Sequence, residues 1–201
     1  MNIPIFVQNR NPMSDIFSEI NFPQKTRGAF IRHAERYSIK AGTQGDSTLL
    51  TPKGMQNAVE LGETLKGIPL RIYSSPVFRC MHTAEQIAKG HGGDIQISRL
   101  SLLGSPGAFI ENSHQAGRFF SQTNAADNYK LYISGKSLPG HHPMDKAVGA
   151  LEKYFSKKLN EQAFTLFISH DIFIMYYLFA KTGYEYKDGF WLDFLDGMLL
   201  E

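Results

Sequence analysis

The sequence predicts an α/β protein with three layers, an αβα sandwich whose central sheet is mostly parallel. Short apolar runs of strand length alternate along the chain with longer segments in which apolar residues recur at helical spacing. Strands that alternate with helices in this way build a parallel sheet that helices cover on both faces. The chain has 201 residues, enough for a sizeable core, so we expect residues 1–201 to form a single domain.

Clear signals mark the elements of the first half of the chain. A Thr or Ser followed by Pro supplies an N-cap and a first-turn proline, which together favour the start of a helix. A glycine after a run of helical spacing favours its end. We expect a strand at Gly28–Arg32, a helix from Thr51-Pro52, a strand at Leu70–Ser74, and a helix from Ser75-Pro76 to Gly90.

The second half repeats the alternation after a long interruption. Its expected elements are a strand at 95–97, a helix opened by Pro143, a strand at 163–169, a helix at 171–181 ended by Gly183, and one or two strands in 191–200. Two segments fall outside the alternation. Residues 1–27 are expected to form an N-terminal arm packed on the domain. Residues 101–142 are an excursion with short helical pieces at 115–120 and 125–133. We expect this excursion to cover the functional site of the protein.

Composition excludes several classes of protein. Apolar residues make up 42% of the chain and charged residues 20%, with a net charge of +2 spread along it, so no concentrated basic face for nucleic acid is expected. The single cysteine, Cys80, suits a reducing compartment. No secretory signal is recognised at the N-terminus, and the longest apolar run, 172–180, is too short for a bilayer. We therefore expect a cytoplasmic protein without membrane contact, of unknown oligomeric state.

The most informative motif is Arg32-His33-Ala34-Glu35-Arg36, directly after the first predicted strand. It places one histidine between two arginines at the end of a buried element. Burying unpaired cations costs several kcal/mol, on the order of the penalty for a lone ion, so such a cluster indicates an anion to be bound. Arginine forks match phosphate oxygens, and histidine can act as a nucleophile. The motif therefore predicts a phosphoryl-transfer site centred on His33.

Two further groups are expected beside His33. Arg79 lies in the first turn of the helix after the second strand, and His170 follows the strand at 163–169. Ligands of open α/β sheets bind beyond the carboxyl ends of the strands, where all three side chains should meet. Asp171 then begins a helix, whose N-terminus adds partial positive charge beside an anion.

Together these segments resemble the histidine phosphatase superfamily, also known as the phosphoglycerate mutase-like fold. The matching motifs are Arg32-His33-Ala34-Glu35-Arg36, Leu50-Thr51-Pro52-Lys53-Gly54, Tyr73-Ser74-Ser75-Pro76-Val77-Phe78-Arg79 and Ile168-Ser169-His170-Asp171. The resemblance covers most of residues 28–181 apart from the excursion. Four motifs in the family's order make it specific, whereas an Arg-His pair alone is weak.

The resemblance implies a role for each matching residue. His33 would be the nucleophile that takes the phosphoryl group. Arg32 and Arg79 would bind the phosphate, with His170 as the second histidine. Arg36 matches a second arginine of the acid-phosphatase branch.

The acid that protonates the leaving group is open between two carboxylates. The pair His170-Asp171 resembles the acid-phosphatase branch, in which the Asp is the proton donor, and such an acid needs a raised pKa. The mutase-type Glu is missing from its usual place after the third strand, and Glu111 is the nearest carboxylate in sequence. A second departure is Ala34, where the family usually has Gly. A methyl group is tolerable there unless the backbone needs a positive φ.

These features predict a metal-independent phosphomonoester phosphatase that needs no cofactor, because side-chain cations can neutralise the phosphate. The adjacent His141-His142 lack the Cys or carboxylate pattern of a metal site. Two alternatives stay open: a phosphomutase of the same fold, and a non-catalytic regulatory protein that binds a phosphorylated ligand. The excursion contributes only Arg118, Lys130 and Lys136 as basic residues. We therefore expect a small or singly phosphorylated substrate, with a phosphoprotein as a further possibility.

Overall fold

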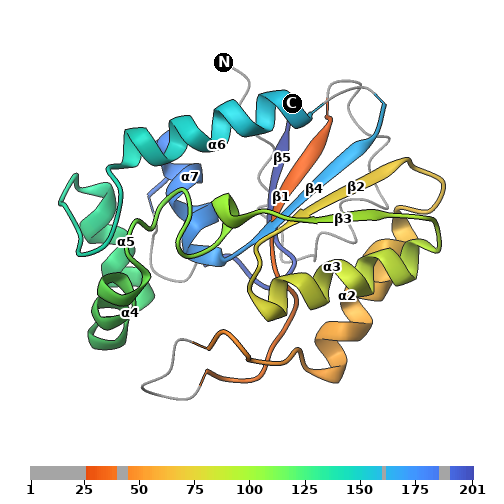
Figure 1. Cartoon of the computed structure of the whole chain (residues 1–201), viewed down its shortest axis with the longest axis horizontal. Helices are drawn as coiled ribbons and strands as arrows, with labels where there is room; N and C mark the ends of the chain where they lie inside the picture. Colours follow the sequence, from red (N-terminus) through yellow and green to blue (C-terminus); the bar gives the residue numbers. More distant parts are fainter. Residues whose placement is uncertain (1–25, 40–44, 160–161, 186–190) are drawn as a thin grey trace.

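A five-stranded sheet forms the centre of the fold, in the order β3-β2-β4-β1-β5 (Figure 1). The computed structural model describes residues 26–39, 45–159, 162–185 and 191–201. The first four strands run parallel, and β5 pairs antiparallel with β1, which confirms the mostly parallel sheet. The strands are β1 Gly28–Arg32, β2 Leu70–Ser74, β3 Gln96–Arg99, β4 Phe164–Ser169 and β5 Gly197–Leu200. The predicted N-terminal arm lies outside the described residues, except for its last two.

Helices cover both faces of this sheet and give the three layers that the sequence predicts (Figure 1). In chain order the helical elements are α2 Pro52–Thr64, α3 Phe78–His91, the 3₁₀ turn η1 Ser101–Leu103, α4 Ser113–Gln122, α5 Ala125–Ile133, α6 Met144–Lys158 and α7 Asp171–Thr182. Helices α2 and α3 pack on one face, and α5, α6 and α7 on the other. Within the described residues, no helix is long and apolar enough to cross a membrane.

The alternation of side chains along β1 explains how one short strand serves two cores. Ala29 and Ile31 point into the core beneath α2 and α3. Phe30, between them, points to the opposite face and packs against Phe155 of α6 and Tyr177 of α7. All five residues of β1 are buried. The strand that carries the Arg-His motif is therefore fixed from both sides.

The first predicted helix start is confirmed, whereas the second is wrong. The Thr51 hydroxyl accepts a hydrogen bond from Gly54 N at 2.9 Å, and Pro52 opens α2. Ser75 does not cap α3, which begins at Phe78 with Val77 as its N-cap. Ser75 N donates to Ile168 O at 2.9 Å. The backbone is therefore still bound to β4 at Ser75, and the helix starts only after this contact ends.

The predicted end of α3 at Gly90 is also wrong, because the helix continues to His91 and ends at Gly92, whose φ is +74°. Gly90 serves a different purpose: a Cβ atom there would lie 1.9 Å from Val59 O of α2. A Cβ on Gly62 of α2 would likewise lie 2.0 Å from Ile87 O of α3. The two glycines thus let the backbones of α2 and α3 approach closely.

Other boundaries differ by a few residues. The third strand occupies Gln96–Arg99 rather than 95–97. The C-terminal tail forms one strand, within the expectation of one or two. The helices opened by Pro143 and ended by Gly183 are confirmed. The excursion contains α4 and α5 where the sequence predicts helical pieces, and α5 packs against α7.

We expect Gly90→Ala to destabilise the protein by about 2 kcal/mol, because overpacking forces two backbones apart. Gly149→Ala in α6 is the matched control, since nothing lies within 4 Å of its added Cβ. There the usual gain of roughly 0.5–1 kcal/mol for replacing a helical glycine should appear. Urea denaturation of both variants measures the difference. Equal effects of the two substitutions would contradict the close approach of α2 and α3.

Candidate active site

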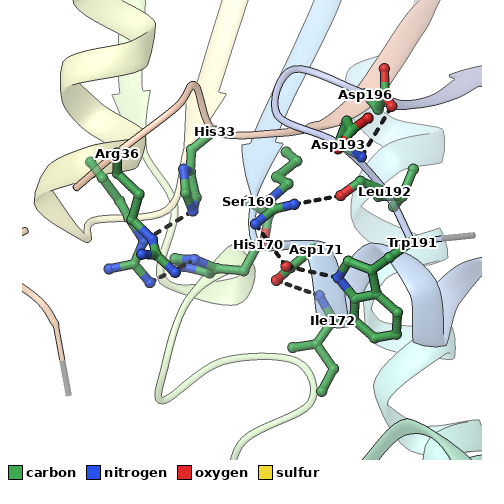
Figure 2. A network of polar contacts seen from close by, with 12 residues as sticks. His33, Arg36, Ser169, His170, Asp171, Ile172, Trp191, Leu192, Asp193 and Asp196 are labelled. Atoms are coloured by element: carbon green, nitrogen blue, oxygen red, sulfur yellow. Dashed lines mark hydrogen bonds and ion pairs between the residues drawn. The ribbon is translucent and has the colours of Figure 1, made fainter. Parts of the chain in front are cut away.

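A cavity of about 470 Å³ lies at the carboxyl edge of the parallel strands. His33 follows β1, His170 follows β4, and Arg79 stands in the first turn of α3, as the topology predicts. The cavity wall includes these three residues together with Arg36 and Asp171. Figure 2 shows His33, Arg36 and His170 converging at this edge. The fold thus brings together residues that are far apart in the sequence.

The Arg79 guanidinium lies between the two histidines. Its Nε donates to His33 Nε2 at 3.1 Å, and its Nη2 lies 3.0 Å from His170 Nδ1. Its Nη1 donates to Gly45 O at 2.9 Å. Each nitrogen of the guanidinium therefore has an acceptor, and the group is held in one orientation while buried.

These contacts fix the tautomer of His33. Its Nδ1 lies 2.8 Å from Ala34 O, and a carbonyl can only accept, so Nδ1 carries the proton. The unprotonated Nε2 then faces Arg79 at the cavity wall. Burial is the main cause that lowers the pKa of His33, to about 3, and the charge of Arg79 lowers it further. His33 is accordingly a neutral imidazole at physiological pH, and its unprotonated Nε2 accepts the hydrogen bond from Arg79.

His170 is the opposite tautomer to His33. Its Nδ1 accepts from Arg79, so Nε2 carries the proton and lies 3.2 Å from Ser75 Oγ. Burial, followed by the charge of Arg79, lowers the pKa of His170 well below its ordinary value. Ser75 is a residue of the site that the sequence analysis assigned to a helix start instead.

The backbone at Ala34 tolerates the replacement of the family's usual glycine. Among the described residues, the only non-glycine position with a positive φ is Leu195. Ala34 is fully buried, and its backbone N–H donates to Thr83 Oγ1 at 3.0 Å. Its methyl group packs in the core under α2 and α3. The condition set by the sequence analysis is therefore met.

The two other arginines of the motif lie differently. Arg36 lines the cavity, donates to Tyr37 O at 2.9 Å, and has a buried Nε without a partner among the described residues. Arg32 is not part of the described cavity wall. Its Nη2 lies 2.9 Å from Asp171 Oδ2, and its guanidinium stacks 4.1 Å from the centre of the Phe194 ring. Arg32 is thus paired with a carboxylate in the free protein.

Asp171 is held as an anion by three groups. Oδ1 accepts from Ile172 N at 2.9 Å, and Oδ2 accepts from Trp191 Nε1 at 2.9 Å and from Arg32 (Figure 2). Burial raises the pKa of Asp171, but the Arg32 charge and the two N–H donors outweigh it, so the pKa lies below its ordinary value. The expectation of a raised pKa is therefore wrong for the free protein, because the sequence does not show these partners.

The loop before β5 supplies contacts that the sequence analysis missed, because it assigned 191–200 to strands. Trp191 binds Asp171, and Leu192 O accepts from Arg32 (Figure 2). The Phe194 ring lies 5.8 Å from that of His33. Arg32 N also donates to Asp196 O at 2.8 Å. Two aromatic residues interleaved with acidic ones, next to a glycine, were the available signal for a turn instead of a strand.

Glu111 lies away from this arrangement. Its side chain is 66% exposed, its nearest ionisable partner is His142 Nδ1 at 3.9 Å, and it is not part of the described cavity wall. Across the described ranges, no three or more His, Cys, Asp or Glu side chains come together in a way that could hold a metal ion. Cys80 is fully buried in the core beneath α2 and α3.

One family model matches part of the chain. The model of the histidine phosphatase superfamily, branch 1, matches residues 29–103. A search of curated proteins gives no match. The family match covers less than half of the chain, so it shows a similarity to this superfamily over β1 to η1.

Several solved structures share the fold. A mycobacterial glucosyl-3-phosphoglycerate phosphatase is 17% identical with a TM-score of 0.53, over 79% of this chain and 80% of that one. A mutant phosphoserine phosphatase from Entamoeba histolytica, in complex with phosphoserine, is 24% identical with a TM-score of 0.51, over 78% and 80%. A phosphoglycerate mutase from Bacillus anthracis is 16% identical with a TM-score of 0.53, over 80% and 82%. At these identities the likeness concerns the fold.

The contacts of Asp171 lead to a prediction about its ionisation. Trp191→Phe keeps an aromatic ring but removes the indole N–H that stabilises the carboxylate, so the pKa of Asp171 should rise. Carboxyl carbon shifts in an NMR titration measure the change. Phe194→Leu is the control, because Phe194 touches Arg32 but makes no hydrogen bond to Asp171. An unchanged titration of Asp171 in Trp191→Phe would refute the role of the indole.

Proposed function

We propose that this chain, as a member of the histidine phosphatase superfamily, is a phosphomonoester phosphatase that works through a covalent phosphohistidine at Nε2 of His33. One observation carries the proposal. Nε2 is unprotonated, lies at the wall of a cavity, and is 3.1 Å from the Nε of Arg79. A nucleophile needs an unprotonated nitrogen, whose lone pair would be released when Arg79 turns to the phosphate, and phosphoryl transfer needs cations around the equatorial oxygens.

The reaction would proceed in two displacements. In the first, His33 Nε2 forms a bond to phosphorus while the ester P–O bond breaks, and the leaving oxygen takes a proton. In the second, water attacks the phosphohistidine, the P–N bond breaks, and inorganic phosphate leaves. Arg79 would turn its N–H groups from the histidines to the phosphate oxygens, and Arg36 would add the Nε that lacks a partner in the described structure. The Nε2–H of His170 would also donate to a phosphate oxygen.

The ion pair of Arg32 and Asp171 connects substrate binding to the acid. Arg32 would reach the phosphate only by leaving Asp171, which is now 2.9 Å away. A bound dianion also opposes the negative charge of Asp171. Both changes raise the pKa of Asp171, because a cation is lost and an anion is gained nearby. We therefore propose that Asp171 becomes the general acid after the phosphate binds, as its likeness to the acid-phosphatase branch implies.

Activity would be independent of metal ions, since three arginines and a histidine would surround the bound phosphate. A phosphomutase would need a Glu as its acid in place of Asp171. The candidate, Glu111, is exposed and lies outside the described cavity wall. The described geometry thus favours hydrolysis, with Asp171 as the nearer acid. A small phosphorylated substrate fits a cavity of about 470 Å³.

His33→Ala should reduce hydrolysis of an aryl phosphate by at least about a thousandfold, the typical scale for loss of a catalytic nucleophile. His114→Ala, on the exposed side of α4, should retain normal turnover. Chelator should leave the activity of the wild type unchanged. Rapid-quench experiments should trap phosphate on the protein that is stable in base and labile in acid, as a P–N bond is. Near-normal turnover of His33→Ala would end the proposal.

Asp171→Asn should distinguish the two possible acids. Its turnover of alkyl phosphates should fall by roughly a hundredfold or more, whereas aryl phosphates with good leaving groups, which hardly need a proton, should be affected much less. Glu111→Gln should lack this dependence on the leaving group. Steady-state kinetics with a series of esters measures both. The reverse pattern would make Glu111 the acid and favour the mutase-like branch.

A further inference from the structure

The cavity extends from the phosphate-binding groups to a second wall formed by α4, α5 and the start of α7. We infer that this wall binds an organic group that carries no charge and has an apolar face, so that the substrate is the phosphomonoester of a neutral alcohol. The inference rests on the proposed function, since it assigns the part of the substrate that leaves with the ester oxygen.

The side chains of the second wall are small, apolar or neutral. Phe120 of α4 and Phe173 of α7 provide aromatic surface, and Ala116 and Gly117 leave room beside them. Phe173 is held by a stacked contact with Phe109, with ring centres 5.7 Å apart. A rigid aromatic surface favours an apolar face on the ligand over a fully hydrated one.

The polar groups of this wall are hydrogen-bonding groups without charge. Ser113 and Ser121 of α4 contribute hydroxyls. Asn128 of α5 lies in the wall although it is only 1% exposed. Its Oδ1 is 2.6 Å from Thr123 Oγ1, and the other end of the amide makes no hydrogen bond to a described residue. A buried amide with a free end at a cavity is suited to a hydroxyl of a ligand.

No cation of the described second wall can pair with a carboxylate or a second phosphate. The basic residues of the excursion, Arg118, Lys130 and Lys136, are all absent from the described cavity wall. Arg118 instead borders a separate surface depression next to Gln122. The charged residues that line the cavity beyond the arginines are Asp46 and Asp171, both acidic. An additional anion on the substrate would lose hydration and meet repulsion.

The uncharged second wall predicts which phosphate esters the protein hydrolyses with the higher kcat/KM. The esters α-glycerol phosphate and 3-phosphoglycerate have the same phosphate and the same carbon skeleton, and differ by a hydroxymethyl group in place of a carboxylate. The wild type should hydrolyse α-glycerol phosphate with a kcat/KM at least about tenfold higher, since an unpaired charge is costly to desolvate. Benzyl phosphate should likewise be preferred to ethyl phosphate, because both release a primary alcohol but only one has an apolar ring.

A positive charge placed on the second wall tests whether the organic group of the substrate binds there. Ser121→Lys should raise the kcat/KM for 3-phosphoglycerate, relative to α-glycerol phosphate, by about fivefold, the scale of a partly exposed ion pair. Gln122→Lys is the matched control: it adds the same charge one residue along α4, but Gln122 borders the separate depression. It should leave the ratio unchanged.

The outcomes separate the two proposals. An aryl phosphate assay that depends on His33 reports the proposed function alone. If that activity is present but 3-phosphoglycerate is preferred, or if Ser121→Lys and Gln122→Lys shift the ratio equally, the inference about the neutral alcohol is wrong and the phosphatase assignment stands. If no aryl phosphate is hydrolysed, the proposed function is wrong, and the substrate inference is overturned with it.

Discussion

The site depends on one guanidinium, that of Arg79, which occupies the space between two imidazoles at the carboxyl edge of the sheet. Arginines and protonated histidines packed this closely would repel one another. The structure avoids this because both histidines stay neutral: burial and Arg79 lower the pKa of His33 to about 3 and that of His170 well below normal. The same neutral state leaves a lone pair on His33 Nε2. The neutral state of the histidines thus explains both why they can pack against Arg79 and why His33 can act as a nucleophile.

The lowered pKa values of the two histidines link the stability of the fold to pH. An unfolded chain would protonate both histidines near their ordinary pKa of about 6.5, whereas the folded chain resists protonation. Each group therefore stabilises the fold fully above about pH 6.5, and the contribution is lost as the pH falls toward the lowered value. A bound phosphate opposes the arginine charges, so it should raise both pKa values and weaken this dependence.

Arg32 has a different relation to its surroundings. It is balanced by Asp171, and the loop before β5 holds both: Trp191 donates to the carboxylate, and Leu192 accepts from the guanidinium (Figure 2). The contacts that hold this ion pair in place also keep Asp171 ionised. In the proposed mechanism the phosphate must therefore compete for Arg32, and this competition prepares the acid. The uncharged wall of α4, α5 and α7 would then decide which alcohol accompanies the phosphate.

The sequence by itself determined the alternating elements, the mostly parallel sheet and the convergence of His33, Arg79 and His170. These follow from local signals and from one topological rule, that ligands of such sheets bind beyond the carboxyl ends of the strands. Thr51 as a cap and Gly183 as a helix end are likewise local, because a cap contacts only its own helix.

Only the tertiary structure decided the start of α3, the use of Gly90 and the state of Asp171. Ser75 remains bound to β4 across 93 residues of sequence, Gly90 meets Val59 of another helix, and Trp191 reaches Asp171 over 20 residues. The sequence patterns of Ser-Pro, Gly and Asp at these positions are the same whether or not such partners exist. Hydrogen bonds, backbone clearance and pKa values depend on distances between segments, and those distances are set by packing.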